Sequence, residues 1–352
     1  MKPSRPGAGP AGWWRAARFH FVPPSFLPAA LAAFVAWAAS GALDLRLYLV
    51  VLLAVCFNHA ALNMTDDYFD YLHSVDSARG REKNPYSGGS GLLTSGQIAP
   101  SRMLAVFCAL YGLTVAAGVY LTAVRGWPVL LFGVFGMACA FFYTAPPLRY
   151  GYHGFGELSQ LVNFSLTIGL GSYYVQTRTL SWEAAAAVLP LGLMMFAMIT
   201  VNEIPDEPGD REGGKGTLVV RLGPRAGVRL YAAAMAAAYL AILGAPLAGL
   251  ASRWAWLGLA TLPWFIQAVL VLARHYRDPA AMAPANLLTI RIHNLTGLLL
   301  IAGLLVRGAQ QGLPMGRAWA ALAILLALYL PVALKVFRPL AGGASPPGRP
   351  AA

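Results

Sequence analysis

Charged residues are scarce in this chain of 352 residues. Asp, Glu, Lys and Arg together make up 11% of it, whereas hydrophobic residues make up 58%. An ordinary soluble domain contains about 25% charged residues, and a soluble core of this size could not bury so many apolar side chains. The composition therefore excludes an ordinary soluble protein and indicates a membrane protein.

Cysteine is also rare, and its positions exclude two kinds of site. Cys56, Cys108 and Cys139 all lie in apolar stretches, and their spacing matches neither a disulfide framework nor a zinc site. The alternating segments of about ten residues that form a membrane β-barrel are not found either. A helical membrane protein is the class that remains.

Apolar stretches of about 17 to 25 residues recur along almost the whole chain, and each is long enough to cross a hydrocarbon layer near 30 Å thick. They predict ten spans, over residues 24–42, 46–65, 102–123, 127–145, 157–176, 184–202, 227–248, 254–274, 287–307 and 317–337. Backbone groups inside lipid must be hydrogen-bonded within the protein, so the fold predicted is an all-α, polytopic transmembrane helical bundle. We interpret the basic start and first apolar run as an uncleaved first helix.

The formal net charge of the chain is +12. In a membrane protein, the informative quantity is how many Lys and Arg residues lie on each side of the membrane. With the N-terminus inside, 19 Lys and Arg residues fall on one side and six on the other, while Arg291 falls inside a span. Cytoplasmic loops carry such an excess of bases. The N-terminus and both acidic loops are therefore predicted to be cytoplasmic, in an inner (cytoplasmic) membrane, and no nucleic-acid partner is expected.

Acidic residues number only fourteen, and ten of them gather in two short stretches at the ends of the second and sixth spans. Acidic side chains at membrane depth are costly and usually functional. A solvated loop is the simpler alternative. The two stretches contain Asp66, Asp67, Asp70, Asp76 and Glu82, and then Glu203, Asp206, Glu207, Asp210 and Glu212.

Oxygen-bearing side chains in both stretches have helical spacing, which favours a site over a solvated loop. Asn63, Asp67 and Asp70 stand at i, i+4 and i+7 with Asp66 at the edge of the same face, and Asn202, Asp206 and Asp210 stand at i, i+4 and i+8. Such ligands suit hard cations such as Mg²⁺, which is often shared with a phosphate-bearing substrate. Pro205 and Pro208 are expected to bend the chain and interrupt the second face.

Basic residues follow both acidic stretches, and the combination fits a metal-bridged diphosphate. The residues 85–91, PYSGGSG, add a glycine-rich loop whose backbone N–H groups suit phosphate oxygens, although a plain flexible loop is the alternative. Instead of binding diphosphate, Arg221 could serve only to fix the orientation of the protein in the membrane. Tyr143 could likewise belong to the belt of aromatic residues at the membrane surface. The diphosphate candidates are Arg79, Lys83, Lys215, Arg221, Tyr143 and Arg149.

The acidic stretches read NMTDDYFDYLHSVD (63–76) and NEIPDEPGDREGGKGTLVVRLG (202–223). They resemble the first and second Asp-rich signatures of the UbiA superfamily of intramembrane prenyltransferases. YTAPPLRYGYHGFGEL (143–158) and GSYYVQT (171–177) resemble a stretch of members that act on 1,4-dihydroxy-2-naphthoate in menaquinone synthesis. Three features depart from the family pattern: Asp66 replaces a common Asn, 203–205 replace Asn-x-Arg, and a tenth span follows the usual nine.

This resemblance implies a domain organisation and an activity. Residues 21–310 would form the prenyltransferase membrane domain of nine core helices, after a basic, partly disordered segment (1–20) and before an additional transmembrane helix (311–338) and a disordered tail (339–352). The activity implied is transfer of a prenyl chain from a polyprenyl diphosphate donor to an aromatic acceptor. Two Mg²⁺ ions, with Mn²⁺ as an alternative, would assist ionisation of the donor.

The resemblance also assigns roles to the candidate residues. The catalytic residues implied are Asp67, Asp70, Asp206, Asp210 and Lys215, and the metal-binding residues implied are Asn63, Asp66, Asp67, Asp70, Asp76, Asn202, Asp206 and Asp210. Within the superfamily, 4-hydroxybenzoate or another quinone, haem or lipid precursor remains open as acceptor, as does a terpene cyclase. A membrane transporter with acidic cation sites is the alternative from another class, although transporters usually bind their ligands near the bilayer midplane.

Overall fold

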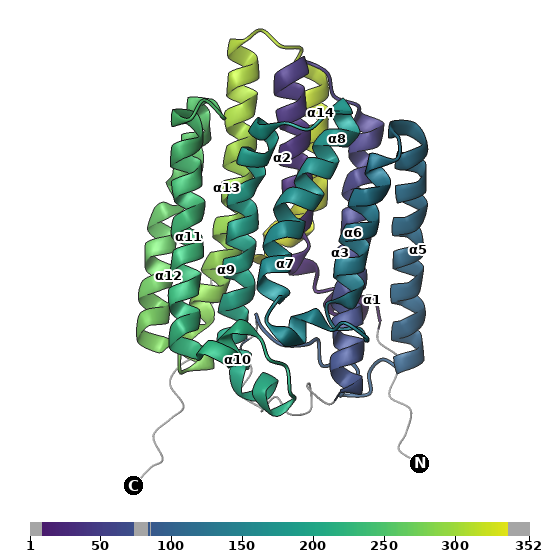
Figure 1. Cartoon of the computed structure of the whole chain (residues 1–352), viewed down its shortest axis with the longest axis vertical. Coiled ribbons are helices and arrows are strands. Elements are labelled where there is room, and N and C mark those ends of the chain that lie inside the picture. The colour runs from purple at the N-terminus through teal and green to yellow at the C-terminus, as the bar shows by residue number, and fades with distance from the viewer. Residues whose placement is uncertain (1–8, 74–83, 85, 337–352) are drawn as a thin grey trace.

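The computed structural model describes residues 9–73, 84 and 86–336, and this part of the chain is helical without β-strands. The predicted all-α fold is thereby confirmed (Figure 1). In chain order the helices are α1 (Pro10–Ala16), η1 (Phe19–Phe21), α2 (Pro23–Ser40), α3 (Leu45–Leu72), α5 (Pro100–Arg125), α6 (Pro128–Phe142), η2 (Tyr150–His153), α7 (Gly156–Val162), η3 (Asn163–Leu170), α8 (Gly171–Thr177), α9 (Trp182–Glu212), α10 (Leu218–Leu222), α11 (Pro224–Leu247), η4 (Arg253–Thr261), α12 (Leu262–His275), α13 (Pro279–Gln310) and α14 (Gly316–Val336).

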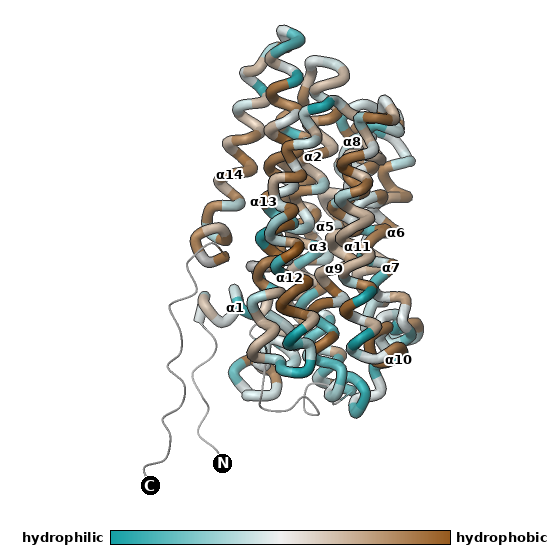
Figure 2. The backbone as a smooth tube through the Cα atoms, turned by 90° about the vertical axis from the view of Figure 1, so that its left-hand side faces the viewer, coloured by the Kyte–Doolittle hydropathy of each residue, from teal (hydrophilic) through white to brown (hydrophobic). Residues whose placement is uncertain are grey.

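Each of the ten predicted spans coincides with helical structure, and the long helices run along a common axis (Figure 1). Within the described residues, eight helices are long and apolar enough to cross a membrane. The fourth predicted span, α6, is shorter, and the fifth is built from α7, the π-helical η3 and α8 in succession. The predicted tenth span is α14. Hydrophobic residues colour the middle of the bundle in Figure 2, as expected for a multi-pass membrane protein.

Large apolar side chains also point outward from the bundle. Val119 on α5, Leu131 on α6 and Leu240 on α11 are each more than half exposed. Water-soluble monomers rarely expose extended apolar surface of this kind. The lipid bilayer is therefore the medium that contacts these helices.

α2 occupies the centre of the bundle and packs against α3, α8, α9, η3 and α13. Nearly all of its residues are buried. Its sequence is apolar on every side and rich in alanine, which is the pattern of a helix without a solvent-facing surface. Because alanine side chains are small, the surrounding helices can approach it closely.

Gly192 lets α9 approach η3 at close range. A Cβ atom added there would lie 2.5 Å from the Cβ of Ser165 and 2.7 Å from the carbonyl oxygen of Leu161. We expect Gly192→Val to lower the free energy of unfolding by about 1–3 kcal/mol, the usual cost of overpacking a core. Denaturant unfolding in detergent micelles measures it. The control is Gly112→Val on the outer face of α5, where a Cβ meets nothing within 4 Å; equal losses in both variants would contradict the explanation.

The expected interruption of the second acidic stretch is wrong, because α9 continues through Pro205 and Pro208 to Glu212. Proline lacks the N–H that would bond to the carbonyl four residues earlier. For Pro205 that carbonyl belongs to Val201, and it accepts a hydrogen bond from the side-chain amide of Asn286 on α13 at 3.2 Å instead. The second motif therefore keeps its helical spacing.

Both acidic stretches extend from helices that end on the same side of the bundle. The ends of α3 and α9 lie with α1, η2 and α10 in the lower part of Figure 1. α3 packs mainly against α5, and α9 packs mainly against α11, so each motif-bearing helix has the same relation to the long helix that follows it. This repeated relation is the arrangement expected of a duplicated helical unit.

Candidate active site

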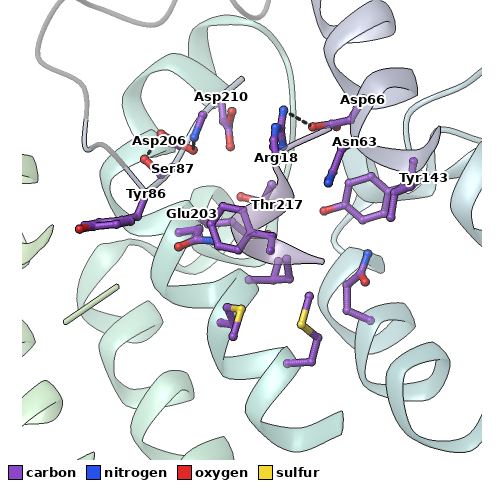
Figure 3. A pocket seen from close by; sticks show the side chains of 18 of the residues that line it. Arg18, Asn63, Asp66, Tyr86, Ser87, Tyr143, Glu203, Asp206, Asp210 and Thr217 are labelled. Atoms are coloured by element: carbon purple, nitrogen blue, oxygen red, sulfur yellow. Dashed lines mark hydrogen bonds and ion pairs between the residues drawn. The ribbon is translucent and has the colours of Figure 1, made fainter. Parts of the chain in front are cut away.

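A pocket opens where α3 and α9 end (Figure 3). Its floor is apolar and includes Phe21, Phe164 and Met198. Seven residues predicted from the sequence line it, namely Asn63, Asp66, Tyr143, Asn202, Asp206, Asp210 and Lys215. The structure therefore brings the two acidic motifs, far apart in sequence, to one cavity.

Arg18 and Lys215 neutralise the carboxylates of the first motif. The guanidinium of Arg18 lies 3.1 Å from Asp66 and also forms an ion pair with Asp67. The Nζ of Lys215 lies 3.0 Å from Asp70 and 3.5 Å from Asp66. Asp67 and Asp70 are only 2% and 1% exposed and lie beside the pocket rather than in its wall. Buried carboxylates need such partners, since an unpaired charge there is strongly destabilising.

Two tyrosines beside these charges remain hydrogen-bond donors. The Tyr152 hydroxyl donates to Asp70 at 2.6 Å, and burial, followed by the negative charge of Asp70, raises the pKa of Tyr152. Tyr143 is 9% exposed and lines the pocket. Lys215 lies over both rings, 5.4 Å from the centre of Tyr152 and 5.9 Å from that of Tyr143. The site therefore presents a phenol that stays protonated at neutral pH.

The described part of the glycine-rich loop, residues 84 and 86–91, bridges the two motifs. The Ser87 hydroxyl and the Gly88 amide each donate to Asp206 at 2.8 Å. The Ser90 amide donates to both oxygens of Asp67, at 3.1 and 3.2 Å. From the sequence, these backbone N–H groups are expected to bind phosphate oxygens. In the structure, those of Gly88 and Ser90 bind the carboxylates of Asp206 and Asp67.

Asn286, fully buried on α13, fixes this loop to the second motif. Its Oδ1 accepts from Asn84 at 2.9 Å, and its Nδ2 donates to the side-chain oxygen of Asn202 at 2.8 Å and to the carbonyl of Val201. One side chain therefore positions the base of the loop and the start of the motif. It also explains why Asn202, expected to bind a metal, has its amide oxygen already engaged.

We expect Asn286→Leu to lower the free energy of unfolding by at least about 1–3 kcal/mol, because buried polar groups of Asn84, Asn202 and Val201 lose their partner. Thermal unfolding in detergent, followed by circular dichroism, measures the loss. Asn84→Leu removes only one of these three bonds and should cost less. An equal loss of stability in the two variants would contradict the idea that Asn286 holds all three partners together.

The structure separates the predicted diphosphate ligands. Tyr143 and Lys215 line the pocket, whereas Arg221 lies outside it and donates to the carbonyl of Gly216 at 2.8 Å. Arg149 stands over the ring of Tyr152 and does not line the pocket either. The predicted site residues Asp76, Arg79 and Lys83 lie outside the described residues.

Arg18 is a site residue that the sequence analysis missed. It was counted only as a charge that fixes topology, within a segment expected to be partly disordered. In the structure α1 and η1 flank it, and Asn63 donates to the neighbouring Ala17 carbonyl at 2.9 Å. No local pattern marks it, because its partners Asp66 and Asp67 follow nearly fifty residues later.

Glu203, also missed, lines the pocket and is 7% exposed. Glu157 is fully buried, and its Oε1 accepts a hydrogen bond from the amide of Leu218 at 2.7 Å. It thereby fixes α10 and the turn that carries Lys215. The departure from the family pattern at residue 203 was the available signal for Glu203.

The residues that line the pocket fit a magnesium ion shared with a substrate. Within the described ranges, no three His, Cys, Asp or Glu side chains lie close enough to hold a metal by themselves. Mg²⁺, however, usually binds one or two carboxylates together with substrate phosphates. Asp66, Asp206 and Asp210 supply carboxylates to one cavity, and these are the hard oxygen ligands that Mg²⁺ prefers.

Residues 26–295 match the UbiA prenyltransferase family. A 1,4-dihydroxy-2-naphthoate octaprenyltransferase of Bacillus subtilis is 29% identical over 293 residues, covering 83% of this chain and 92% of that protein. The protein of the same name from Escherichia coli is 30% identical over 292 residues, covering 80% of this chain and 92% of its own length.

Solved structures share the fold. A UbiA homologue from Archaeoglobus fulgidus, solved with GPP and Mg²⁺, superposes with a TM-score of 0.61 at 15% identity, covering 84% of this chain and 99% of that one. A UbiA homologue from Aeropyrum pernix gives a TM-score of 0.57 at 17% identity, covering 80% and 97%. The family match favours a prenyltransferase over a membrane transporter.

Proposed function

Because the chain belongs to the UbiA prenyltransferase family, we propose that it transfers a polyprenyl chain from its diphosphate to 1,4-dihydroxy-2-naphthoate, a step of menaquinone biosynthesis. The observation that carries the proposal is the single pocket in which carboxylates of two helices and the bases Arg18 and Lys215 stand above an apolar floor. Relatives named for this acceptor support the choice of substrate.

The pocket has a polar end and an apolar end, which suit the diphosphate group and the hydrocarbon chain of a prenyl diphosphate. Its polar end holds charged groups of both signs, and its other end is lined by Phe164, Met195, Met198 and Ile199. Guanidinium and ammonium groups bind phosphate oxygens strongly. The diphosphate therefore lies at the polar end and the first isoprene units lie against the methionines, whose flexible side chains adapt to irregular apolar shapes.

Metal binding is assigned to both motifs. Asp66, Asp67 and Asp70 on α3 and Asp206 and Asp210 on α9 would hold two Mg²⁺ ions, with Mn²⁺ able to replace them. Bound Mg²⁺ neutralises charge on the diphosphate leaving group. Since Arg18 and Lys215 already pair with the first motif, these bases move from carboxylate to diphosphate oxygens when the donor binds.

The chain's own residues support a step in which the allylic C–O bond breaks and its electron pair leaves with the diphosphate. Lys215 and Arg18 stabilise the developing negative charge, and the protonated Tyr143 donates a hydrogen bond to it. The apolar floor excludes water from the allylic cation. The electron-rich ring carbon that carries the acceptor's carboxylate then bonds to the cation, and the electron pair of the ring–carboxyl bond at that same carbon restores aromaticity as CO₂ leaves.

We also propose the orientation in the membrane. Among the described residues, most Lys and Arg belong to the helix ends and connections on the pocket side of the bundle, for example Arg18, Arg102 and Lys215, and such residues gather on the cytoplasmic side. The diphosphate site then faces the cytoplasm of an inner membrane, and a water-soluble acceptor can reach it from there.

A membrane assay tests the proposed function. Radiolabelled polyprenyl diphosphate is offered with 1,4-dihydroxy-2-naphthoate or with 4-hydroxybenzoate, in Mg²⁺ or in EDTA. We expect metal-dependent formation of the prenylated naphthoquinol alone. Transfer only to the benzoate would keep the reaction class and reject the acceptor, whereas release of diphosphate without transfer to either acceptor would indicate a terpene cyclase.

A further inference from the structure

A further cavity lies beside the acidic pocket, at residues that precede the first acidic motif on α3. The two cavities share the wall residues His59, Leu62, Gln160 and Phe164, so they adjoin. Its wall comes from α2, α3, α6, η2, α7 and η3. It includes several polar side chains: Ser25, Asn58, His59, Tyr150, Gln160 and Asn163. A cavity so rich in polar groups is unexpected among helices that cross a membrane.

The side-chain oxygen of Asn163 has no hydrogen-bond partner among the described residues, although Asn163 is only 9% exposed. Its orientation is determined by Ser159, whose carbonyl accepts from the Asn163 nitrogen at 2.9 Å. The nitrogen therefore faces its own helix, and the oxygen faces Gly136 across the cavity. An acceptor left unpartnered in such a place costs about 1–3 kcal/mol.

Asn58 repeats this feature on the other wall. Its Oδ1 is also buried without a hydrogen-bond partner among the described residues, and Asn58 lines the same cavity from α3. By contrast, the Tyr150 hydroxyl is satisfied by the Cys139 carbonyl and by Ser159, and Ser25 bonds to His59. The two amide oxygens are therefore the acceptors that a bound molecule would satisfy.

A prenyl chain cannot satisfy them, because it carries no hydrogen-bond donor. A hydroxylated aromatic ring can, since its hydroxyl groups donate. We infer that this cavity binds the hydroxyl-bearing part of the aromatic acceptor, with the oxygens of Asn58 and Asn163 each accepting a hydrogen bond from one hydroxyl group. The inference rests on the proposed function and adds to it the residues that select a dihydroxylated acceptor.

The position of the cavity suits this role. Asn58 precedes Asp66 by eight residues on α3, which is about 12 Å along a helix axis. An acceptor with its hydroxyl groups on the two asparagines extends toward the shared wall at His59 and Phe164, so its carboxylate points to the end where Arg18 and Lys215 lie. The reacting ring carbon then lies between the cavity and the diphosphate site.

Gly136 and the π-helical η3 keep this cavity open. A Cβ at residue 136 would lie 3.3 Å from the Thr167 methyl carbon and 3.9 Å from the Asn163 oxygen, so a larger side chain would cover that oxygen. The π-helix begins at Asn163, and π-helical turns are rare and frequently occur at functional sites. Both features preserve access to the amide oxygen.

Equilibrium binding to the purified full chain tests the inference. Calorimetry in detergent, with Mg²⁺ and inorganic diphosphate present, gives Kd for 1,4-dihydroxy-2-naphthoate and for 1-hydroxy-2-naphthoate, which lacks one hydroxyl. We expect the protein to bind the dihydroxy compound about tenfold more tightly, the effect of one buried hydrogen bond. Either Asn58→Leu or Asn163→Leu, whichever removes the oxygen that accepts from the missing hydroxyl, should abolish this difference.

Two controls separate binding from folding. Asn294→Leu makes the same change at a buried position on α13 that lines neither cavity, and it should keep the tenfold difference. In both cavity variants the KM of the prenyl donor should stay within about twofold of the original. A tenfold difference that persists in both variants, or that is missing in the unmodified protein, would overturn the inference, whereas failure of the unmodified protein to bind or prenylate any naphthoate would overturn the proposed function itself.

Discussion

Replacing Asp206 by asparagine should lower kcat/KM for prenyl transfer by about 10²- to 10³-fold, the effect of removing one charged group that stabilises a transition state. Asp206 lines the pocket opposite the first motif and receives hydrogen bonds from Ser87 and Gly88. Asparagine has nearly the same shape and keeps one acceptor oxygen, so the loop should remain bound. The loss should therefore be in catalysis and in the Mg²⁺ concentration that gives half-maximal rate.

Glu207→Gln is the matched control, since it removes one carboxylate from the next residue of the same helix. Glu207 pairs with Arg211 and does not line the pocket. Steady-state kinetics at several Mg²⁺ concentrations should show less than about a twofold change, because an ion pair at the protein surface contributes little. An equal loss of kcat/KM in the two variants would mean that the total negative charge of α9 matters, and not the position of Asp206 in the pocket.

The fold could be predicted because lipid imposes a simple requirement on the chain. Each helix that crosses the membrane needs an apolar run of a certain length, and those runs are visible in the sequence. The predicted spans end at residues 65 and 202, where hydropathy falls and the acidic motifs begin. The helices continue to Leu72 and Glu212, as the helical spacing of both motifs requires, since helical hydrogen bonds do not depend on hydropathy.

The candidate site could be predicted only as far as local spacing reaches. The periodicity of Asn202, Asp206 and Asp210 predicted residues that do line the pocket. In the first motif, the same argument put Asp67 and Asp70 on one face with Asn63, whereas Asn63 and Asp66 line the pocket and Asp67 and Asp70 lie beside it. The spacing also could not show that these two carboxylates meet Arg18 and Lys215. Those partners come from distant segments, and a single sequence carries no signal that pairs them.

The contacts of Asn286, which join Asn84 before the glycine-rich loop to α9, also could not be predicted from the sequence. Asn286 directly precedes the predicted span 287–307 and looks like an ordinary polar residue there. Its role follows from a proline: Pro205 leaves the Val201 carbonyl without its helical donor, and Asn286 replaces that donor while holding Asn84. A sequence rule that proline interrupts a helix is correct for the isolated segment, but tertiary contacts supply what the backbone lacks.

Replacing Lys215 by methionine should lower kcat by about 10²-fold or more, because the ammonium no longer stabilises the departing diphosphate. It should also destabilise the fold by about 3–5 kcal/mol, since Asp70, only 1% exposed, loses the cation 3.0 Å away. Chemical denaturation and single-turnover kinetics measure these two effects separately. Arg211→Met, a basic residue four positions earlier that is exposed and paired with Glu207, should change neither quantity appreciably.

The double variant Lys215→Met with Asp70→Asn separates a structural role of Lys215 from a catalytic one. Neutralising both partners removes the unpaired buried charge, so most of the lost stability should return. Turnover of the double variant should stay below that of Asp70→Asn alone, which lacks the same carboxylate but keeps the base. A double variant that regains stability and turns over as fast as Asp70→Asn alone would show that Lys215 serves only to neutralise Asp70, and the diphosphate would then need another base, such as Arg18, which lines the same pocket.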